Sequence, residues 1–298
     1  MTNHLDLPWI RSMLYVPGNR PDWMSKALSY AADALVLDLE DSVPADEKVA
    51  ARGAVAAFLH ENNGPKPILV RINEPADPAF LRDVEAIACP GLTGIVVPKV
   101  QGPRDIHLAD QVLGWVENEV GLPPGRIAIS PVLETATGIR NAHEIARSST
   151  RVAYTGGLGV KGGDVERALG YRWTRQGRET LTLRAQTLLD VRAAGVPNPM
   201  TGLWTDVNDV DGLRAFATQS RELGYEGMAI IHPSHADIVN AAFSVTELEL
   251  DYYRRLVGAL EEAEADRRAA VTFEGEMVDI AMLKTARQRL DSVAARTS

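Results

Sequence analysis

Eight short apolar runs, separated by longer amphipathic segments, recur through the first 235 residues of this 298-residue chain. Runs rich in Val, Ile and Leu are typical of parallel strands that are buried on both faces. The segments between them have helical periodicity; one opens with Pro21-Asp22 and another ends at Gly195. We predict strands over residues 12–18, 34–41, 67–73, 94–100, 127–135, 151–157, 198–204 and 227–234.

This count of strands and helices predicts an α/β fold of the (β/α)8 TIM-barrel type. An open doubly wound sheet also alternates, but it usually has fewer strands, and no Gly-x-Gly-x-x-Gly follows the first run. Beyond the last strand we predict helices only, over about 236–243, 246–267 and 276–294. The expected organisation is a catalytic barrel over 1–235 and a C-terminal helical extension over 236–298, in which "AAVTFEGEMVD" forms a hinge or an arm.

Composition excludes several classes of protein. A formal net charge of −9 and a pI of about 5.2 argue against nucleic acid or an acidic membrane as the main partner. Cys89 is the only cysteine, so no internal disulfide can form, and we expect it to be a small buried hydrophobe in a reducing compartment. With neither a signal-peptide pattern nor a membrane-length apolar run in the sequence, we expect a cytoplasmic protein.

Ionisable side chains lie at or after the ends of seven of the predicted strands, although the strands themselves are apolar. The stretch "ALVLDLEDSV" runs from a buried strand directly into Asp38, Glu40 and Asp41. Barrel enzymes carry their chemistry at the carboxyl ends of their strands, so we expect these acids to enter a polar pocket. The other polar strand-end residues are Arg20, Arg71, Asn73, Lys99, Glu134, Asp164 and His232.

Each of these residues alone has a structural explanation. Asp41 or Ser42 could cap the next helix, and Arg71 could belong to a structural ion pair. Lys99 could neutralise a neighbouring acid, and His232 could be a turn residue. Convergence of all of them on one barrel mouth favours a functional site.

Two of the acids suit a metal. Glu134 and Asp164 follow adjacent predicted strands, which lie about 5 Å apart, so the two carboxylates can share one divalent cation. Oxygen ligands without a nearby cysteine favour Mg2+ or Mn2+ over zinc. Asp38, Glu40 and Asp41 are then expected to hold the waters and ligands around the metal.

Arg71 offers a planar guanidinium that can bind a carboxylate with two parallel hydrogen bonds. A pocket with a magnesium ion and such a clamp suits a 2-oxo acid or a 2-hydroxy acid, because chelation polarises the carbonyl. We therefore predict that Arg71 and Glu134 contact the substrate.

Seven motifs, in order, resemble one known family. They are "RSMLYVPG", "ADALVLDLEDSV" followed by "EKVAAR", "VRIN", "VPKV", "ETATGIRNAHEIA", "MAIIHPSHADIVNAAF" and "GEMVDIAMLKTAR". The chain is similar over nearly its whole length to the citrate lyase β-subunit-like (HpcH/HpaI aldolase) family, which includes malyl-CoA and citramalyl-CoA lyases. More distantly it resembles the class II 2-oxo acid aldolases.

The resemblance implies a (β/α)8 barrel with C-terminal helices, assembled as a homotrimer or a dimer of trimers with shared active sites. It implies Mg2+-dependent cleavage of a 3-hydroxyacyl-CoA to acetyl-CoA, or a homologue, and a 2-oxo acid. The aspartate that matches Asp279 reaches a neighbouring subunit's site in that family. The roles carried over are metal ligands for Glu134 and Asp164, the oxo-acid grip for Arg71, and the metal's outer shell for Asp38, Glu40 and Asp41. We also assign coenzyme A binding to Arg20, Lys26 and Lys99.

Two segments depart from the family pattern or leave its roles open. The loop "GGLGVKGGD" is longer than the family's usual Gly-x-x-Asp, and it contains Lys161, which could touch substrate. The basic segment "LGYRWTRQGRETLTLR" could serve coenzyme A phosphates or be a solvated helix face. Its basic residues are Arg172, Arg175, Arg178 and Arg184.

Three other functions stay open from the sequence. The first is a 2-oxo acid aldolase that uses no coenzyme A. The second is a β subunit that works only within a multi-protein lyase carrying an acyl carrier protein. The third is a thioester hydrolase, in which a water near the metal attacks the product thioester.

Overall fold

The computed structural model describes residues 7–156 and 161–297. Residues 157–160, which include the end of the predicted strand 151–157 and part of the glycine-rich loop, lie outside the described residues. Within the described part of the chain, no helix combines the length and the apolar character needed to cross a membrane.

Two compact units make up the chain, Met1–Phe243 and Ser244–Ser298. The first unit extends past the expected boundary at residue 235, because helix α10 (Ala236–Phe243) belongs to it.

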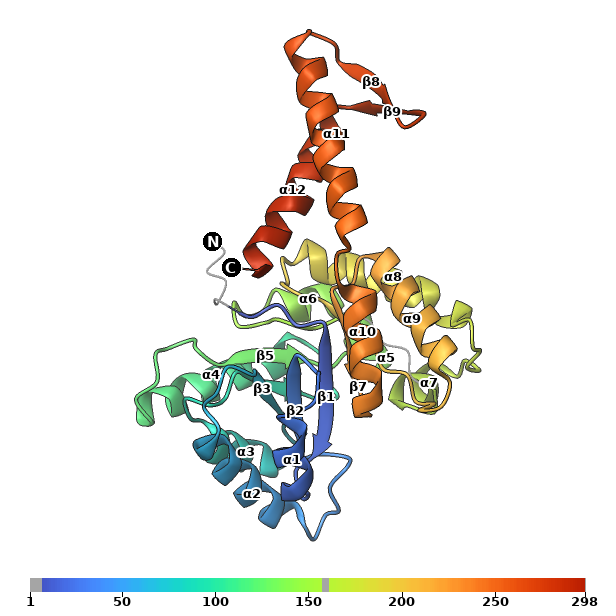
Figure 1. Ribbon diagram of the computed structural model, residues 1–298. Coiled ribbons are helices and arrows are strands. Elements are labelled where there is room, and N and C mark those ends of the chain that lie inside the picture. The colour runs from blue at the N-terminus through green and yellow to red at the C-terminus, as the bar shows by residue number, and fades with distance from the viewer. Residues whose placement is uncertain (1–6, 157–160, 298) are drawn as a thin grey trace. The chain divides into compact units, whose positions relative to one another are not determined.

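A curled parallel sheet forms the centre of the first unit (Figure 1). Its seven strands lie in the order β5-β4-β3-β2-β1-β7-β6, and all six neighbouring pairs are parallel. The strands are β1 (Ser12–Pro17), β2 (Ala34–Asp38), β3 (Ile68–Arg71), β4 (Gly94–Val97), β5 (Ala128–Pro131), β6 (Met200–Thr201) and β7 (Gly227–Ile230).

The prediction of an α/β fold with a parallel sheet is confirmed, whereas the described residues do not form a closed eight-stranded barrel. The predicted strand 151–157 contributes one isolated bridge, Ile129↔Val152. On its other side, the Tyr154 N–H donates to the Pro197 carbonyl at 3.2 Å. The backbone explains the weak pairing. Tyr154 has a φ of 57°, outside the extended region, and Pro197 has no N–H to donate.

The strand residues alternate between two hydrophobic layers. Along β2, Leu35 and Leu37 pack in the outer layer against the helices, while Ala34 and Val36 pack in the inner layer. The next inward position is Asp38, at the carboxyl end of the strand. The alternation that buries the apolar side chains therefore also directs Asp38 to the inner face of the sheet.

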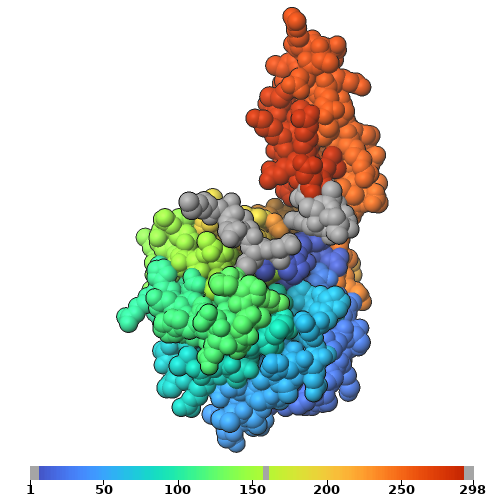
Figure 2. Space-filling view, turned by 90° about the vertical axis from the view of Figure 1, so that its left-hand side faces the viewer, coloured from blue at the N-terminus to red at the C-terminus, as the bar shows by residue number. Residues whose placement is uncertain are grey.

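Helices cover the outer layer through buried side chains such as Met24, Val55 and Leu113. Figure 2 shows the outer face that the first half of the chain, in blue to green, builds over this layer. The predicted end of one helix is confirmed, since Gly195 follows α8 with a φ of 83°. The helices of this unit are α1 (Pro21–Ala27), α2 (Lys48–Glu61), α3 (Ala79–Ile87), α4 (Pro103–Glu119), α5 (Ala136–Arg140), α6 (Ala142–Ala146), α7 (Asp164–Leu169), α8 (Arg178–Ala193), α9 (Val210–Leu223), the 3-10 turn η1 (Pro233–His235) and α10.

The second unit contains α11 (Glu247–Ala265), α12 (Ile280–Thr297) and an antiparallel hairpin of β8 (Ala270–Phe273) and β9 (Glu276–Asp279). The predicted helix over 276–294 is therefore wrong at its start, because residues 276–279 form a strand. The turn residues Glu274 and Gly275 have φ values of 50° and 89°, which suit the tight turn of a hairpin. The unit has its own apolar core, formed by Leu256, Leu260, Val278, Leu283 and Ala286.

A buried ion pair supports the edge of the sheet where the eighth strand was expected. Both Glu117 carboxylate oxygens accept hydrogen bonds of 2.7 Å from Arg151, and they also accept from the backbone N–H groups of Gly125 and Ile127 at 2.8 Å. The Glu117 side chain is fully buried and that of Arg151 is 6% exposed. These bonds offset the cost of burying both charges.

We expect Glu117→Ala to lower the free energy of unfolding by about 3–5 kcal/mol, because Arg151 then keeps a buried charge without its main partner. Urea unfolding followed by circular dichroism measures the loss. Glu119→Ala is the matched control, an exposed glutamate on the same helix. A loss in Glu117→Ala no larger than the control's would show that the pair does not support the fold.

Candidate active site

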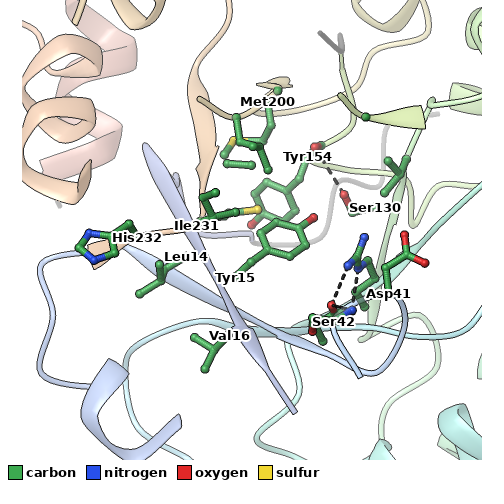
Figure 3. A pocket seen from close by; sticks show the side chains of 18 of the residues that line it. Leu14, Tyr15, Val16, Asp41, Ser42, Ser130, Tyr154, Met200, Ile231 and His232 are labelled. Carbon is green, nitrogen blue, oxygen red and sulfur yellow. Dashed lines mark hydrogen bonds and ion pairs between the residues drawn. The ribbon is translucent and has the colours of Figure 1, made fainter. Parts of the chain in front are cut away.

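A pocket of about 670 Å3 opens at the carboxyl ends of the strands (Figure 3). Six of the residues to which the sequence analysis assigned a role line it: Lys26, Asp38, Asp41, Arg71, Glu134 and Asp164. Its apolar wall includes Leu14, Val16, Trp23, Tyr30, Val132 and Ile231. A pocket that combines charged groups with an apolar wall suits a ligand with an acidic head and a longer body.

Asp38 accepts hydrogen bonds on both carboxylate oxygens. Arg71 donates to them at 2.7 and 2.6 Å, and the N–H groups of Glu40 and Ser42 donate at 2.9 and 3.1 Å. Burial raises the pKa of Asp38, but the bonds from Arg71 lower it below its ordinary value overall. The loop after β2 is thus folded around a buried, charged carboxylate. Neither Asp41 nor Ser42 caps α2, whose N-cap is Glu47.

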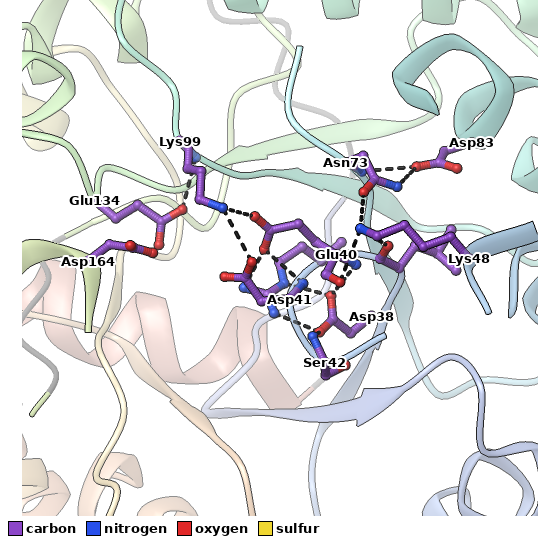
Figure 4. Close-up of polar contacts among 12 residues, drawn as sticks. Asp38, Glu40, Asp41, Ser42, Lys48, Asn73, Asp83, Lys99, Glu134 and Asp164 are labelled. Atoms are coloured by element: carbon purple, nitrogen blue, oxygen red, sulfur yellow. Dashed lines mark hydrogen bonds and ion pairs between the residues drawn. The ribbon is translucent and has the colours of Figure 1, made fainter. Parts of the chain in front are cut away.

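Glu40 bridges two cations in the same site (Figure 4). Its Oε2 lies 3.0 Å from Arg71 Nη1, and its Oε1 lies 2.5 Å from Lys99 Nζ. The more exposed Asp41 lies 3.3 Å from the same ammonium. Burial lowers the pKa of Lys99, but its hydrogen bond to Glu40 raises it above the ordinary value overall. Lys99 therefore neutralises acids, as the structural alternative predicted.

Two kinds of contact fix the orientation of the Arg71 guanidinium. Its Nε and Nη2 donate to Asp38, and its Cζ lies 5.4 Å from the centre of the Tyr15 ring. A guanidinium has five N–H groups, so three remain for Glu40 and for a bound anion. Arg71 thus forms a structural ion pair and, at the same time, lines the pocket with donors to spare.

Glu134 and Asp164 bring two carboxylates together (Figure 4). Glu134 Oε1 accepts a hydrogen bond from the backbone N–H of Lys99 at 2.9 Å. Burial, with a further contribution from the charge of Asp164, raises the pKa of Glu134 to about 7. Asp164 begins α7 and forms an ion pair with the exposed Arg167. Two facing acids that repel one another are the donor set that a hard divalent cation takes.

This pair is small for a metal centre made of protein ligands alone. No group of three or more His, Cys, Asp or Glu suited to a metal occurs among the described residues. Magnesium commonly uses one or two carboxylates and completes its octahedron with water and substrate oxygens. The two acids therefore fit Mg2+ better than a zinc site, which needs three or four protein ligands.

The three cations predicted for coenzyme A lie in different surroundings. Lys26 lines the pocket from α1. The Arg20 guanidinium lies over Trp23, 4.2 Å from the ring centre, and 3.6 Å from Asp22. Neither Arg20 nor Lys99 is among the residues that line the pocket.

Asp279 belongs to the second unit, where it ends β9. Its carboxylate accepts hydrogen bonds from the N–H groups of Ala281 and Met282, at 2.9 and 3.3 Å, and so caps α12. His232 is both a turn residue and a pocket residue, because its ring accepts from the Ser234 N–H at 3.3 Å while it lines the pocket.

The basic segment after the glycine-rich loop was predicted either to bind coenzyme A phosphates or to form a solvated helix face. Neither prediction holds for all of its arginines. Arg184 is fully buried and donates to the Ser220 hydroxyl at 3.1 Å, so it cannot belong to a solvated face or bind phosphate at the surface. Arg175 is exposed and binds Asp209 through two hydrogen bonds of 2.9 and 2.5 Å.

Sequence reasoning missed two residues that shape the site. Tyr15 lines the pocket, and burial raises its pKa to about 12, so the phenol stays protonated. Lys48 donates to the carbonyls of Leu39 and Glu40 at 3.2 and 3.3 Å and thereby fixes the acidic loop. The sequence contained a clue to each residue. Tyr15 lies two residues after Met13 and therefore faces the same side of the strand, and Lys48 belongs to the motif "EKVAAR".

Comparisons with known proteins agree on one family. The family model described as HpcH/HpaI aldolase/citrate lyase matches residues 11–233. The chain is 31% identical to citrate lyase subunit beta of Leuconostoc mesenteroides subsp. cremoris, over 90% of this chain and 88% of that protein. It is 32% identical to a (3S)-malyl-CoA thioesterase of Cereibacter sphaeroides, over 96% and 95% of the two chains.

Solved structures extend the similarity to three dimensions. The protein CitE of Mycobacterium tuberculosis, in complex with magnesium, acetoacetate and coenzyme A, superposes with a TM-score of 0.75 at 26% identity. The match covers 97% of this chain and 98% of that one.

If Glu134 and Asp164 share a cation, Asp164→Asn should weaken Mg2+ binding by about tenfold or more, since even the outer partners of metal sites contribute ten- to a hundredfold. The fold should persist, because the lost partner, Arg167, is exposed. Isothermal titration calorimetry with MgCl2 measures the change. Asp237→Asn, an exposed aspartate outside the pocket, is the control. Equal Mg2+ affinity in wild type and Asp164→Asn would contradict the assignment.

Proposed function

Because the chain belongs to the HpcH/HpaI aldolase/citrate lyase family, we propose that it is a Mg2+-dependent carbon–carbon lyase acting on a 3-hydroxyacyl-CoA. The products are acetyl-CoA and a 2-oxo acid, and the substrate is of the malyl-, citramalyl- or citryl-CoA type. One observation carries the proposal: a pair of facing carboxylates and an arginine with unused N–H groups line one pocket. Relatives named for citrate lyase and for a malyl-CoA thioesterase support coenzyme A thioester chemistry.

Glu134 and Asp164 would hold the magnesium ion. The CitE complex with magnesium and coenzyme A supports this cofactor and this form of substrate. Bound there, the metal supplies Lewis-acid polarisation of the oxo-acid carbonyl. The chain's own contribution is to keep Glu134 in place through the Lys99 N–H and to present Asp164 from the start of α7.

Arg71 would bind the carboxylate of the oxo-acid portion with the N–H groups that Asp38 does not use. The guanidinium is already held before substrate binds, by two hydrogen bonds to Asp38, an ion pair with Glu40 and contact with the Tyr15 ring. Such preorganisation lowers the ordering cost of binding and aligns the bond to be cleaved. In the cleavage, a base takes the proton of the 3-hydroxyl, and its oxygen forms the carbonyl of the 2-oxo acid as the carbon–carbon bond breaks. The electron pair of that bond passes to the thioester enolate, which then takes a proton at carbon.

Asp279 would supply or relay that last proton in the site of a neighbouring subunit. Its exposure and its place at the start of α12 support a group that can meet a partner. The assembly would be a homotrimer or a dimer of trimers, with a catalytic barrel domain and a C-terminal arm.

Coenzyme A would lie along the apolar part of the pocket. Lys26 lines the pocket, and Arg20 lies on the turn that precedes α1. Both are proposed to meet phosphates, and Lys99 is the third cation predicted for that role.

The deciding experiment assays the purified protein with malyl-, citramalyl- and citryl-CoA in the presence of Mg2+. Release of acetyl-CoA together with a 2-oxo acid supports the lyase, and the preferred substrate identifies the oxo acid. Release of free coenzyme A without carbon–carbon cleavage indicates a thioesterase. Activity on the free hydroxy acid alone indicates an aldolase that uses no coenzyme A.

A second candidate is a β subunit that works only within a larger lyase. Relatives named citrate lyase subunit beta, matched over about nine tenths of both chains, favour it. Inactivity of the isolated protein on every thioester, with activity restored by partner chains carrying an acyl carrier protein, would support this candidate.

Arg71→Lys should lower kcat/KM by roughly ten- to a hundredfold, equivalent to about 1.5–3 kcal/mol, because an ammonium cannot bind Asp38 and a substrate carboxylate in one plane. Steady-state kinetics on the preferred thioester measure the loss. Arg82→Lys, an exposed arginine on α3, is the control. Near wild-type kinetics in Arg71→Lys would show that Arg71 has a structural role only.

Mixed oligomers test the role of Asp279. Asp279→Ala and Asp164→Ala should each be inactive, and dissociating and re-associating them together should restore part of the activity. Some sites then combine an intact Glu134 and Asp164 from one subunit with an intact Asp279 from its neighbour. Verified re-association without any returned activity would rule out action across subunits.

A further inference from the structure

Lys99 has an unusual backbone for a residue at the end of a strand. It follows β4 with a φ of 53°, in the left-handed region that non-glycine residues seldom adopt. Strained residues of this kind persist where the surrounding structure holds them, and they are frequent at functional sites. Here the conformation coincides with the N–H of Lys99 donating to Glu134 Oε1 at 2.9 Å.

The two loops on either side of this contact are joined a second time. The Thr135 hydroxyl donates to the Val100 carbonyl at 3.2 Å, one residue on from Glu134 and from Lys99. Gly138 lies so close to that carbonyl that an added Cβ would meet it at 2.1 Å. The chain after Lys99 is therefore closely packed, and this packing explains how the left-handed conformation is maintained.

The side chain of Lys99 points to a different part of the site (Figure 4). β4 neighbours β5 and β3, whereas the acidic loop follows β2. Lys99 Nζ nevertheless contacts Glu40 Oε1 at 2.5 Å and Asp41 Oδ1 at 3.3 Å. The other oxygen of Glu40 lies 3.0 Å from Arg71 Nη1. The backbone of Lys99 thus contacts Glu134, one of the two acids proposed to bind the metal. Its side chain contacts Glu40, which in turn contacts Arg71.

We infer that Lys99 is a positioning residue with two separable functions. Its left-handed backbone holds Glu134 for the metal, and its ammonium holds Glu40 so that Arg71 keeps the orientation that binds the oxo-acid carboxylate. The inference rests on the proposed function for the identity of that ligand. It differs from contact with a coenzyme A phosphate, which would require the ammonium to leave the buried Glu40.

Four substitutions separate the functions. Lys99→Met keeps the unbranched stem and loses the ammonium, whereas Lys99→Arg keeps the charge. Lys99→Gly loses the side chain and accepts a positive φ without strain, while Lys99→Val also loses the ammonium but resists that conformation because it is β-branched. Calorimetry on the full-length variants measures the Kd of Mg2+, of pyruvate and glyoxylate with Mg2+ present, and of free coenzyme A.

Expected results differ for each ligand. Lys99→Met and Lys99→Gly should weaken oxo-acid binding by about tenfold, as for loss of a charged hydrogen bond, and should leave the Mg2+ affinity within about twofold of wild type. Lys99→Val should weaken Mg2+ binding as well. Lys99→Arg should bind oxo acids more tightly than Lys99→Met and Lys99→Gly do, because it keeps a cation beside Glu40. A purely structural role does not predict this rescue.

Contrary outcomes are distinct. Unchanged oxo-acid affinity in Lys99→Gly would overturn the side-chain function, and equal Mg2+ affinity in folded Lys99→Gly and Lys99→Val would overturn the backbone function. Weakened coenzyme A binding with unchanged oxo-acid binding would make Lys99 a coenzyme ligand instead.

Two further outcomes keep the inference separate from the proposed function and from folding. If wild type binds Mg2+ and oxo acids but cleaves no thioester, the proposed substrate fails while these comparisons still decide the inference. If the Lys99→Val variant does not fold, Lys99→Met and Lys99→Arg decide the side-chain function. Lys99→Gly then decides whether Mg2+ binding needs the ammonium.

Discussion

The fork between Arg71 and Asp38 is the interaction on which the rest of the site depends. A carboxylate directed inward at the end of a buried strand is costly unless a cation and several N–H groups meet it. Arg71 supplies the cation from the neighbouring strand, and the loop after β2 supplies the N–H groups of Glu40 and Ser42. This folding of the loop in turn brings Glu40 between Arg71 and Lys99. The acids that follow the apolar strand are thus part of one compensated network.

Much of this arrangement could be predicted from the sequence, because parallel strands follow simple geometric rules. Period-two alternation identifies which side chains face inward, and parallel order brings the carboxyl ends to one edge. Asp38, Arg71, Glu134 and Asp164 were predicted because they lie at or after the ends of predicted strands, and all four line the pocket. Their chemical roles remain proposals, since a shared location does not by itself specify a ligand.

What the sequence did not reveal depends on backbone conformations and long-range contacts that no local pattern encodes. The left-handed Lys99 lies in an ordinary "VPKV", and residues 276–279, which were predicted to begin a helix, form a strand after the Glu274-Gly275 turn. Arg184 sits in a basic stretch that looks solvated, yet it is buried against Ser220 of α9. Burial of a charge is decided by tertiary partners, and those appear only when the chain is folded.

The weak pairing around residues 151–154 has a consequence for how this architecture can vary. That part of the sheet is joined through one bridge and one hydrogen bond to Pro197, so few ladder contacts restrict the chain that leaves it. In a fully paired strand, a slip of one residue would turn its inward side chains outward, so the ladder fixes the register. At this seam, between the edge strands β5 and β6, few paired backbone groups oppose a change in the number of residues. The segment "GGLGVKGGD" follows this seam in the sequence, so residues added there would alter the approach to Asp164 while the strands that carry Asp38 and Arg71 stay paired.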